Sequence, residues 1–137
     1  MTHEPQGATP LYFAFRDRNI DIANRLLAEG ADPNVPIVED ITLLHLAATA
    51  GWIEGINALL DRGALINPRD EFLREIPLHK AARNLEEVAI KVLCARGADE
   101  SLKNLDGLDY RGLLECAERH PDEWRVGDDM GTYCTYY

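Results

Sequence analysis

Cys116 and His120 stand four residues apart in the segment ECAERHP, a spacing that places both side chains on one face of a helix. An imidazole next to a thiol is the arrangement that activates a cysteine as a nucleophile. The surrounding sequence, however, predicts no oxyanion site, and the chain contains no nucleophile elbow, phosphate-binding loop or glycine-rich dinucleotide turn. A catalytic site in the irregular C-terminal third is therefore the alternative hypothesis, and a chain that is not an enzyme is the leading one.

Two histidines, His45 and His79, each follow a leucine in similar segments, LLHLAA and PLHKAA. A zinc ion needs at least three protein ligands around one point. If the two segments are neighbouring helices, their axes lie about 8–10 Å apart, which is too far for both histidines to bind one ion. Asp128 and Asp129 favour a solvated turn over a cation site. We therefore expect neither a metal nor a cofactor.

One pattern of residues occurs three times along the chain. Three leucines each begin an L-x-x-A motif, at separations of 33 and 34 residues: Leu11, Leu44 and Leu78. Nineteen residues after each of these leucines comes a Gly-Ala pair, beginning at Gly30, Gly63 and Gly97. A repeat of this length predicts a stack of supersecondary units, none of which can bury its apolar face alone.

The first copy shows what one unit contains. Thr9 is a suitable N-cap, and Pro10 fits the first helical position because its missing N–H costs nothing there. The turn-prone cluster at 17–19 ends this short helix. A second helix then runs to Gly30, which suits a left-handed C-cap. The prediction is an all-α solenoid of stacked helix-turn-helix units with projecting hairpin loops.

The repeat resembles the ankyrin repeat family over about residues 7–101. The residues that carry the resemblance are TPL at 9–11, LHxAA at 44–48 and 78–82, Gly51, and Gly-Ala-Asp at 30–32 and 97–99. The chain departs from the family pattern at five positions: Arg18, Leu43, Leu65, Ile76 and Leu85. The resemblance implies that the histidine of each copy bonds backbone of the neighbouring loop. It also implies that the first helices and the hairpin tips line a concave, partner-binding side.

We expect a single domain over residues 1–137. Its parts are repeats at about 7–37, 38–71 and 72–104, a degenerate capping repeat at 105–120, and a tail at 121–137. Leu114 begins a further L-x-x-A motif, on a helix expected at about 111–120. We expect Trp124, in the tail, to be at least half buried against that helix, near Leu113 or Leu114. A recognition segment that docks on a partner is the alternative role for the tail.

The composition narrows the class of partner. A net charge of −10 disfavours nucleic acid, which requires a basic stripe, and it disfavours an acidic membrane surface. The N-terminus reads neither as a secretory signal nor as a transit peptide. The cysteines are a sparse, odd set of three, which predicts no disulfide framework and favours a reducing compartment: Cys94, Cys116 and Cys134. We expect a cytoplasmic monomer that binds a protein partner. The acidity of the chain is compatible with a basic surface on that partner.

The candidate partner-binding residues fall into three groups. They lie at the ends of the first helices, on two hairpin tips and at the start of one second helix: Arg16, Asp17, Thr49, Arg83 and Asn84; Glu39, Asp40, Ile41, Asp70, Glu71, Phe72, Leu73 and Arg74; and Trp52. Phe72 and Leu73 are bulky and apolar where a tip is normally polar, so they either pack on the adjacent tip or contact a partner.

The hypothesis has two parts. Phe72, Leu73 and Arg83 anchor the partner, and four acids steer it: Glu39, Asp40, Asp70 and Glu71. Trp52 is expected to fill a groove between copies, with partner contact as its alternative role. The roles of inhibitor, immunity protein and adaptor stay open.

Overall fold

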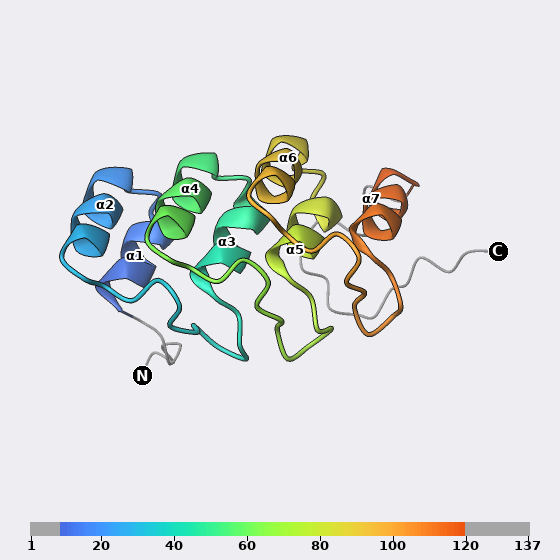
Figure 1. The fold of residues 1–137 in the computed structure, drawn as a ribbon, viewed down its shortest axis with the longest axis horizontal. Coiled ribbons are helices and arrows are strands. Elements are labelled where there is room, and N and C mark those ends of the chain that lie inside the picture. The colour runs from blue at the N-terminus through green and yellow to red at the C-terminus, as the bar shows by residue number, and fades with distance from the viewer. Residues whose placement is uncertain (1–8, 120–137) are drawn as a thin grey trace.

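Seven α-helices form the part of the chain that the computed structural model describes, residues 9–119 (Figure 1). They are α1 (Pro10–Arg16), α2 (Ile20–Ala28), α3 (Leu43–Ala50), α4 (Ile53–Asp61), α5 (Pro77–Arg83), α6 (Glu87–Ala95) and α7 (Tyr110–Arg119). Within residues 9–119, the only β pairing is an isolated bridge between Val38 and Ile41. The predicted all-α fold with hairpin loops is confirmed.

The helices are stacked in two rows. The first helices of the repeats, α1, α3, α5 and α7, pack in sequence against one another, and the second helices, α2, α4 and α6, form the other row. Figure 1 shows the long loops between repeats projecting together from the side of the α1–α7 row. The described part is therefore a solenoid in which each repeat contacts its neighbours.

Helix ends follow the expected local chemistry. Thr9 Oγ1 accepts a hydrogen bond from Tyr12 N at 3.2 Å, as an N-cap should. In the turn between the two helices of each repeat stand Arg18, Gly51 and Leu85, whose φ values are 53°, 67° and 57°. Arg18 and Leu85 thus adopt the left-handed conformation that the glycine adopts in the second repeat. Their departure from the family pattern leaves the geometry of the turn unchanged.

The core follows the same spacing in every first helix. Each first helix buries a leucine and, three and four residues later, two smaller or aromatic residues: Leu11, Ala14 and Phe15; Leu44, Ala47 and Ala48; Leu78, Ala81 and Ala82; Leu113, Cys116 and Ala117. In α7 the buried leucine is thus Leu113, one residue before the predicted Leu114, which is only half buried. The small residues let successive helices approach closely.

For the central repeat, the sequence predicts a core of Leu44, Ala47, Leu59 and Leu60. Leu44, Ala47 and Leu59 are buried, as expected. Leu60 was expected to be buried as well, and this prediction is wrong because its side chain is only half buried. One residue along a helix turns a side chain by about 100°, so α4 cannot direct both leucines at the core.

Several predictions lie outside the described residues: those for His120, Trp124, Asp128, Asp129 and the tail at 121–137. Among the helices of residues 9–119, none combines the length and the apolar character that crossing a membrane requires.

Candidate functional site

The loop between the first and second repeats closes as a tight hairpin. Ile37 N donates to Ile41 O at 2.6 Å, and Ile41 N donates to Val38 O at 2.8 Å. Glu39 and Asp40 form its apex with φ values of 50° and 61°, in the left-handed region that side chains other than glycine rarely adopt. The turn presents both acids, which are exposed, at the first tip.

The next two tips share this geometry. Backbone hydrogen bonds close them, from Asp70 N to Glu75 O at 3.0 Å and from Asn104 N to Leu108 O at 2.9 Å. Each tip carries a left-handed residue near its end: Asp40, Arg74 and Gly107, with φ values of 61°, 56° and 77°. This residue gives the three tips a common register.

Backbone hydrogen bonds also join neighbouring tips to each other. Glu71 N donates to Glu39 O at 3.0 Å, and Leu105 N donates to Leu73 O at 2.8 Å. In both bonds the accepting carbonyl belongs to the residue directly before the left-handed one: Glu39 precedes Asp40, and Leu73 precedes Arg74. The tips therefore form one continuous row along the solenoid, visible in Figure 1 as adjacent loops.

The second tip divides its residues between solvent and interior. Glu71, Phe72 and Arg74 are exposed, with 55% of Phe72 accessible. Leu73 is half buried, and Ile41 of the first tip is half buried against the core. Phe72 is therefore the predicted anchor that stands most clearly in solvent.

Asp70 does not face solvent, and the prediction that it steers a partner from the surface is wrong. Its side chain is fully buried. Asp70 Oδ1 accepts from Leu73 N and Glu75 N, both at 3.1 Å, and Oδ2 lies 2.8 Å from Lys80 Nζ. The carboxylate thus holds the tip closed from inside, because it satisfies two backbone donors that the turn leaves unpaired.

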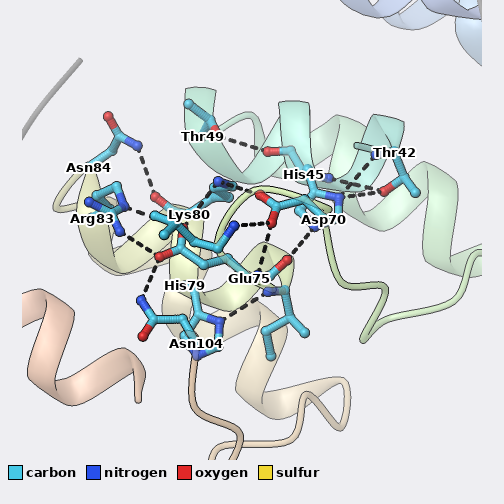
Figure 2. Close-up of polar contacts among 12 residues, drawn as sticks. Thr42, His45, Thr49, Asp70, Glu75, His79, Lys80, Arg83, Asn84 and Asn104 are labelled. Atoms are coloured by element: carbon cyan, nitrogen blue, oxygen red, sulfur yellow. Dashed lines mark hydrogen bonds and ion pairs between the residues drawn. The ribbon is translucent and has the colours of Figure 1, made fainter. Parts of the chain in front are cut away.

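Glu75 lies at the centre of this buried network (Figure 2). Its Oε2 lies 2.5 Å from Arg83 Nη2 and 2.8 Å from Asn104 Nδ2, and its Oε1 lies 3.1 Å from Lys80 Nζ. Burial alone would raise the pKa of Glu75, but the hydrogen bond from Arg83 and the charges of Lys80 and Arg83 outweigh it and lower that pKa to about 2. The carboxylate therefore stays ionised in the interior.

Arg83 was expected to anchor the partner, but the structure assigns its guanidinium another role. Its side chain is only 13% exposed, and both Nε and Nη2 contact the carboxylate of Glu75. A guanidinium that already forms a buried two-point ion pair would have to break it to bind a new carboxylate. Arg83 stabilises the loop and α5.

The two histidines link successive repeats, as the resemblance implied. His45 Nδ1 accepts from Thr42 N at 3.0 Å, and its Nε2 donates to Glu75 O at 2.8 Å. His79 repeats the arrangement with Ile76 N and Leu102 O, both at 3.0 Å. Burial lowers the pKa of both imidazoles, which suits neutral rings with one donor and one acceptor.

The remaining candidates lie at the ends of the first helices and at the start of α4. Arg16 and Asp17 are exposed and form an ion pair at 3.3 Å. Thr49 is exposed, although its hydroxyl donates to His45 O at 2.9 Å. Asn84 is half buried and donates to Lys80 O at 2.9 Å. Together they leave a polar surface beside the tips.

Trp52 fills a groove between repeats, as predicted. It is only 9% exposed, and its ring packs edge-on against Phe15 of the first repeat with centroids 5.0 Å apart. Such aromatic pairs add to the free energy of burial. Trp52 is therefore a packing residue, and its buried ring is not available to contact a partner.

The catalytic alternative finds no support at Cys116. This residue is fully buried on α7, so its sulfur is not accessible to a substrate. Cys94, on α6, is a free thiol. In residues 9–119 no cluster of three or more His, Cys, Asp or Glu side chains is placed to hold a metal ion.

Sequence reasoning missed three features of this surface. Leu105 and Asp106 were assigned to a capping repeat, yet they form the exposed third tip. Val38 lies on the first tip and is exposed, although it is not among the predicted contact residues. Aligning the tips by their turn residues, instead of aligning the helices, would have revealed all three.

Comparisons with known proteins support the repeat. The family model described as ankyrin repeat matches residues 6–37 and 39–71. A probable 26S proteasome regulatory subunit, p28, of Saccharomyces cerevisiae is 30% identical over 96 residues, which are 69% of this chain and 42% of the relative. The transient receptor potential channel pyrexia of Drosophila melanogaster is 38% identical over 97 residues, which are 70% of this chain and 10% of the channel.

A third relative extends the range of proteins that carry the repeat. Alpha-latroinsectotoxin-Lt1a of Latrodectus tredecimguttatus is 36% identical over 104 residues, covering 75% of this chain and 7% of the toxin. The chain thus spans less than half the length of each of these relatives. The chain belongs to the ankyrin repeat family.

Proposed function

We propose that this chain is a non-catalytic protein-interaction module that binds a protein partner through its row of hairpin tips and the adjoining ends of its first helices. The observation that carries the proposal is the exposed Phe72, a large aromatic side chain on a loop that is otherwise held closed from inside. Exposed aromatic residues on rigid supports are the usual hot spots of interfaces.

The charges around Phe72 favour a partner with a basic surface. Glu39, Asp40 and Glu71 are exposed on the same row of tips, and the whole chain carries a net charge of −10. Exposed acids of this kind act mainly on the rate of association, since they steer the encounter and add little net affinity. Asp70 and Arg83 are not among the proposed contact residues, because their side chains form hydrogen bonds and ion pairs in the interior.

The relatives are compatible with a binding role and do not identify the partner. Their names describe a proteasome regulatory subunit, a channel and a toxin, and the shared region is a minor part of each. Inhibitor, immunity protein and adaptor are three ways in which a binding module can act. A cytoplasmic monomer remains our expectation from sequence.

The test is to capture partners on the parent protein, identify them by mass spectrometry and measure the affinity of the purified partner. Phe72→Ser should weaken binding by about 30-fold or more, which corresponds to the usual hot-spot threshold of about 2 kcal/mol. Val88→Ser is the matched control, because Val88 is 61% exposed but lies on the second helix α6. A partner that is lost with Val88→Ser and retained with Phe72→Ser would place the interface on the opposite side and contradict the proposal.

A further inference from the structure

Three exposed apolar side chains share one position in consecutive hairpin tips. Val38, Phe72 and Leu105 are 40%, 55% and 65% exposed. Each stands two residues before the left-handed residue of its tip, the position occupied by Asp40, Arg74 and Gly107. Half of the six large apolar side chains that residues 9–119 expose are therefore gathered on the tips in register. We call these three residues the tip ridge.

The tip ridge has a fixed spacing because the tips are fixed to one another. The hydrogen bonds from Glu71 N to Glu39 O and from Leu105 N to Leu73 O hold adjacent tips side by side. Below them, Glu75 of the second tip and Asn104 of the third share a buried hydrogen bond of 2.8 Å. Since each tip belongs to one repeat and the repeats stack through their helices, we expect successive members of the ridge to lie about one helix-packing distance apart, roughly 8–10 Å.

Acidic side chains border the tip ridge along its whole length. Glu39 and Asp40 are exposed on the first tip, Glu71 on the second and Asp106 on the third. Between the closing residues of the tips, at 37–41, 70–75 and 104–108, the exposed basic residue is Arg74, and the exposed Lys103 directly precedes the third tip. Since acids outnumber bases here by four to two, the ridge is an apolar line in an acidic field. A second copy of this chain would bring like charges together, so it is a poor occupant.

We propose that the tip ridge binds a basic amphipathic α-helix of a partner protein, an inference that rests on the proposed function and specifies its ligand. Seven residues of α-helix rise about 10.5 Å and return to the same face, so apolar residues at i, i+7 and i+14 match the three members of the ridge. A β-strand does not match, because residues on one of its faces recur every 6.6 Å or so.

A polyproline segment is the competing occupant, since it returns to the same face after about 9 Å. A polyproline segment has only two residues between successive apolar anchors. An α-helix has six, and the residues beside its apolar stripe can carry lysine or arginine toward Glu39, Glu71 and Asp106. The acidic border therefore favours the helix, which satisfies both the apolar spacing and the charges.

The probe is a synthetic 21-residue peptide with leucine at three heptad positions, lysine and arginine beside them and alanine elsewhere. Its affinity for the whole chain is measured by isothermal titration calorimetry, and its helicity by circular dichroism. Two control peptides are a scrambled sequence of the same composition and a variant with a central proline. We expect binding by the first peptide, at least about 10-fold weaker binding by both controls, and a gain of helical signal in the complex.

Two triple variants of the protein locate the site. The variant Val38→Ser, Phe72→Ser, Leu105→Ser should bind the helical peptide about 30-fold more weakly or worse. The variant Ile22→Ser, Leu65→Ser, Val88→Ser changes the three other exposed apolar side chains and should bind within about threefold of the parent. All six side chains are exposed, so both variants should keep the parent's denaturation midpoint.

Four results would overturn the inference: equal binding of the scrambled peptide, equal binding to the ridge variant, tighter binding of a proline-rich peptide, or self-association of the parent that the ridge variant abolishes. The proposed function is tested separately. A native partner that binds the parent and is lost with Phe72→Ser, while the helical peptide does not bind, supports the function and refutes the helix. A native partner that binds the ridge variant normally refutes both.

Discussion

Glu75 and Arg83 form a buried two-point ion pair between a hairpin tip and the end of helix α5. Arg83 Nε lies 3.3 Å from Glu75 Oε1, and Arg83 Nη2 lies 2.5 Å from Oε2. Asn104 donates to the same carboxylate from the third tip (Figure 2). The pair therefore couples the exposed tips to the helical core.

Glu75→Gln should lower the free energy of unfolding by about 3–5 kcal/mol, the usual cost of removing one partner from a buried ion pair. The change keeps the size of the side chain and removes the charge that Arg83 and Lys80 both contact. Urea denaturation followed by circular dichroism measures the loss. Because the repeats stabilise one another, the single transition should shift as a whole.

Glu71→Gln is the matched control for this variant. It makes the same chemical change four residues earlier on the same tip, but Glu71 is exposed. We expect a change within about 0.5 kcal/mol, as for most surface substitutions. Equal denaturation midpoints for the two variants would show that the ion pair does not hold the tip.

The pH dependence of stability should show two stages. The pKa values of His45 and His79 are lowered from 6.5 by burial, so the unfolded chain binds protons more readily and stability begins to fall as the pH drops below about 6.5. The pKa of Glu75 is about 2 in the folded state against 4.5 ordinarily, so its contribution is complete above pH 4.5 and is lost as the pH falls from 4.5 to about 2. Urea midpoints measured from pH 8 to pH 3 test both stages.

Glu75→Gln separates the two stages. The variant should keep the decline that begins near pH 6.5, because His45 and His79 are unchanged. Its further decline below pH 4.5 should be shallower than that of the parent, because position 75 no longer titrates. A parent protein whose midpoint is flat between pH 8 and pH 5 would contradict the role assigned to the histidines.

The repeat could be predicted from sequence because its signals are local and recur. The L-x-x-A leucines and the Gly-Ala pairs fixed the register of three repeats, and the stacking followed from the need of each helix to bury an apolar face. For α7, however, the motif placed the core leucine at position 114, and the buried leucine is Leu113. The segment LLECA offers two adjacent leucines, and only packing against α5 selects Leu113 for the interior.

The binding surface was harder to predict because polarity alone does not show whether a loop residue faces outward. The tip DEFLRE reads as exposed throughout, yet its first and last residues, Asp70 and Glu75, are buried. Their cations, Lys80 and Arg83, lie on the following helix, so the pairing depends on how the loop folds back. Phe72, between them, is exposed, whereas its neighbour Leu73 is half buried.

Leu59→Ala should cost about 2–5 kcal/mol, the range for truncating a buried leucine. Leu59 is completely buried on α4, whereas its neighbour Leu60 is half buried. Leu60→Ala is therefore an internal control with the same chemistry, and it should cost clearly less. Urea denaturation of both variants measures the difference, and the reverse order would mean that α4 is rotated by one residue.

Arg74→Gly should stabilise the chain by up to about 1 kcal/mol. Arg74 has a φ of 56°, and the equivalent residue of the third tip is Gly107. Holding an ordinary residue in the left-handed region costs about 1–2 kcal/mol, of which glycine's extra freedom in the unfolded chain offsets about 0.5–1 kcal/mol. Arg74→Ala removes the charge but keeps the strain, so it should give no such gain. A thermal melt of the two variants decides between strain and charge.

Gly55→Ala should destabilise the chain, although alanine is the better helix former by about 1 kcal/mol. Gly55 lies in α4, and a Cβ added there would collide with the indole ring of Trp52, which is packed between repeats and has little room to move. Overpacking of this kind usually costs about 1–3 kcal/mol. The decisive comparison is made in a Trp52→Leu background, where the smaller side chain removes the collision. There, Gly55→Ala should be neutral or stabilising. A double-mutant cycle from urea denaturation measures the coupling, and additive effects of the two changes would show that the indole does not occupy the space above Gly55.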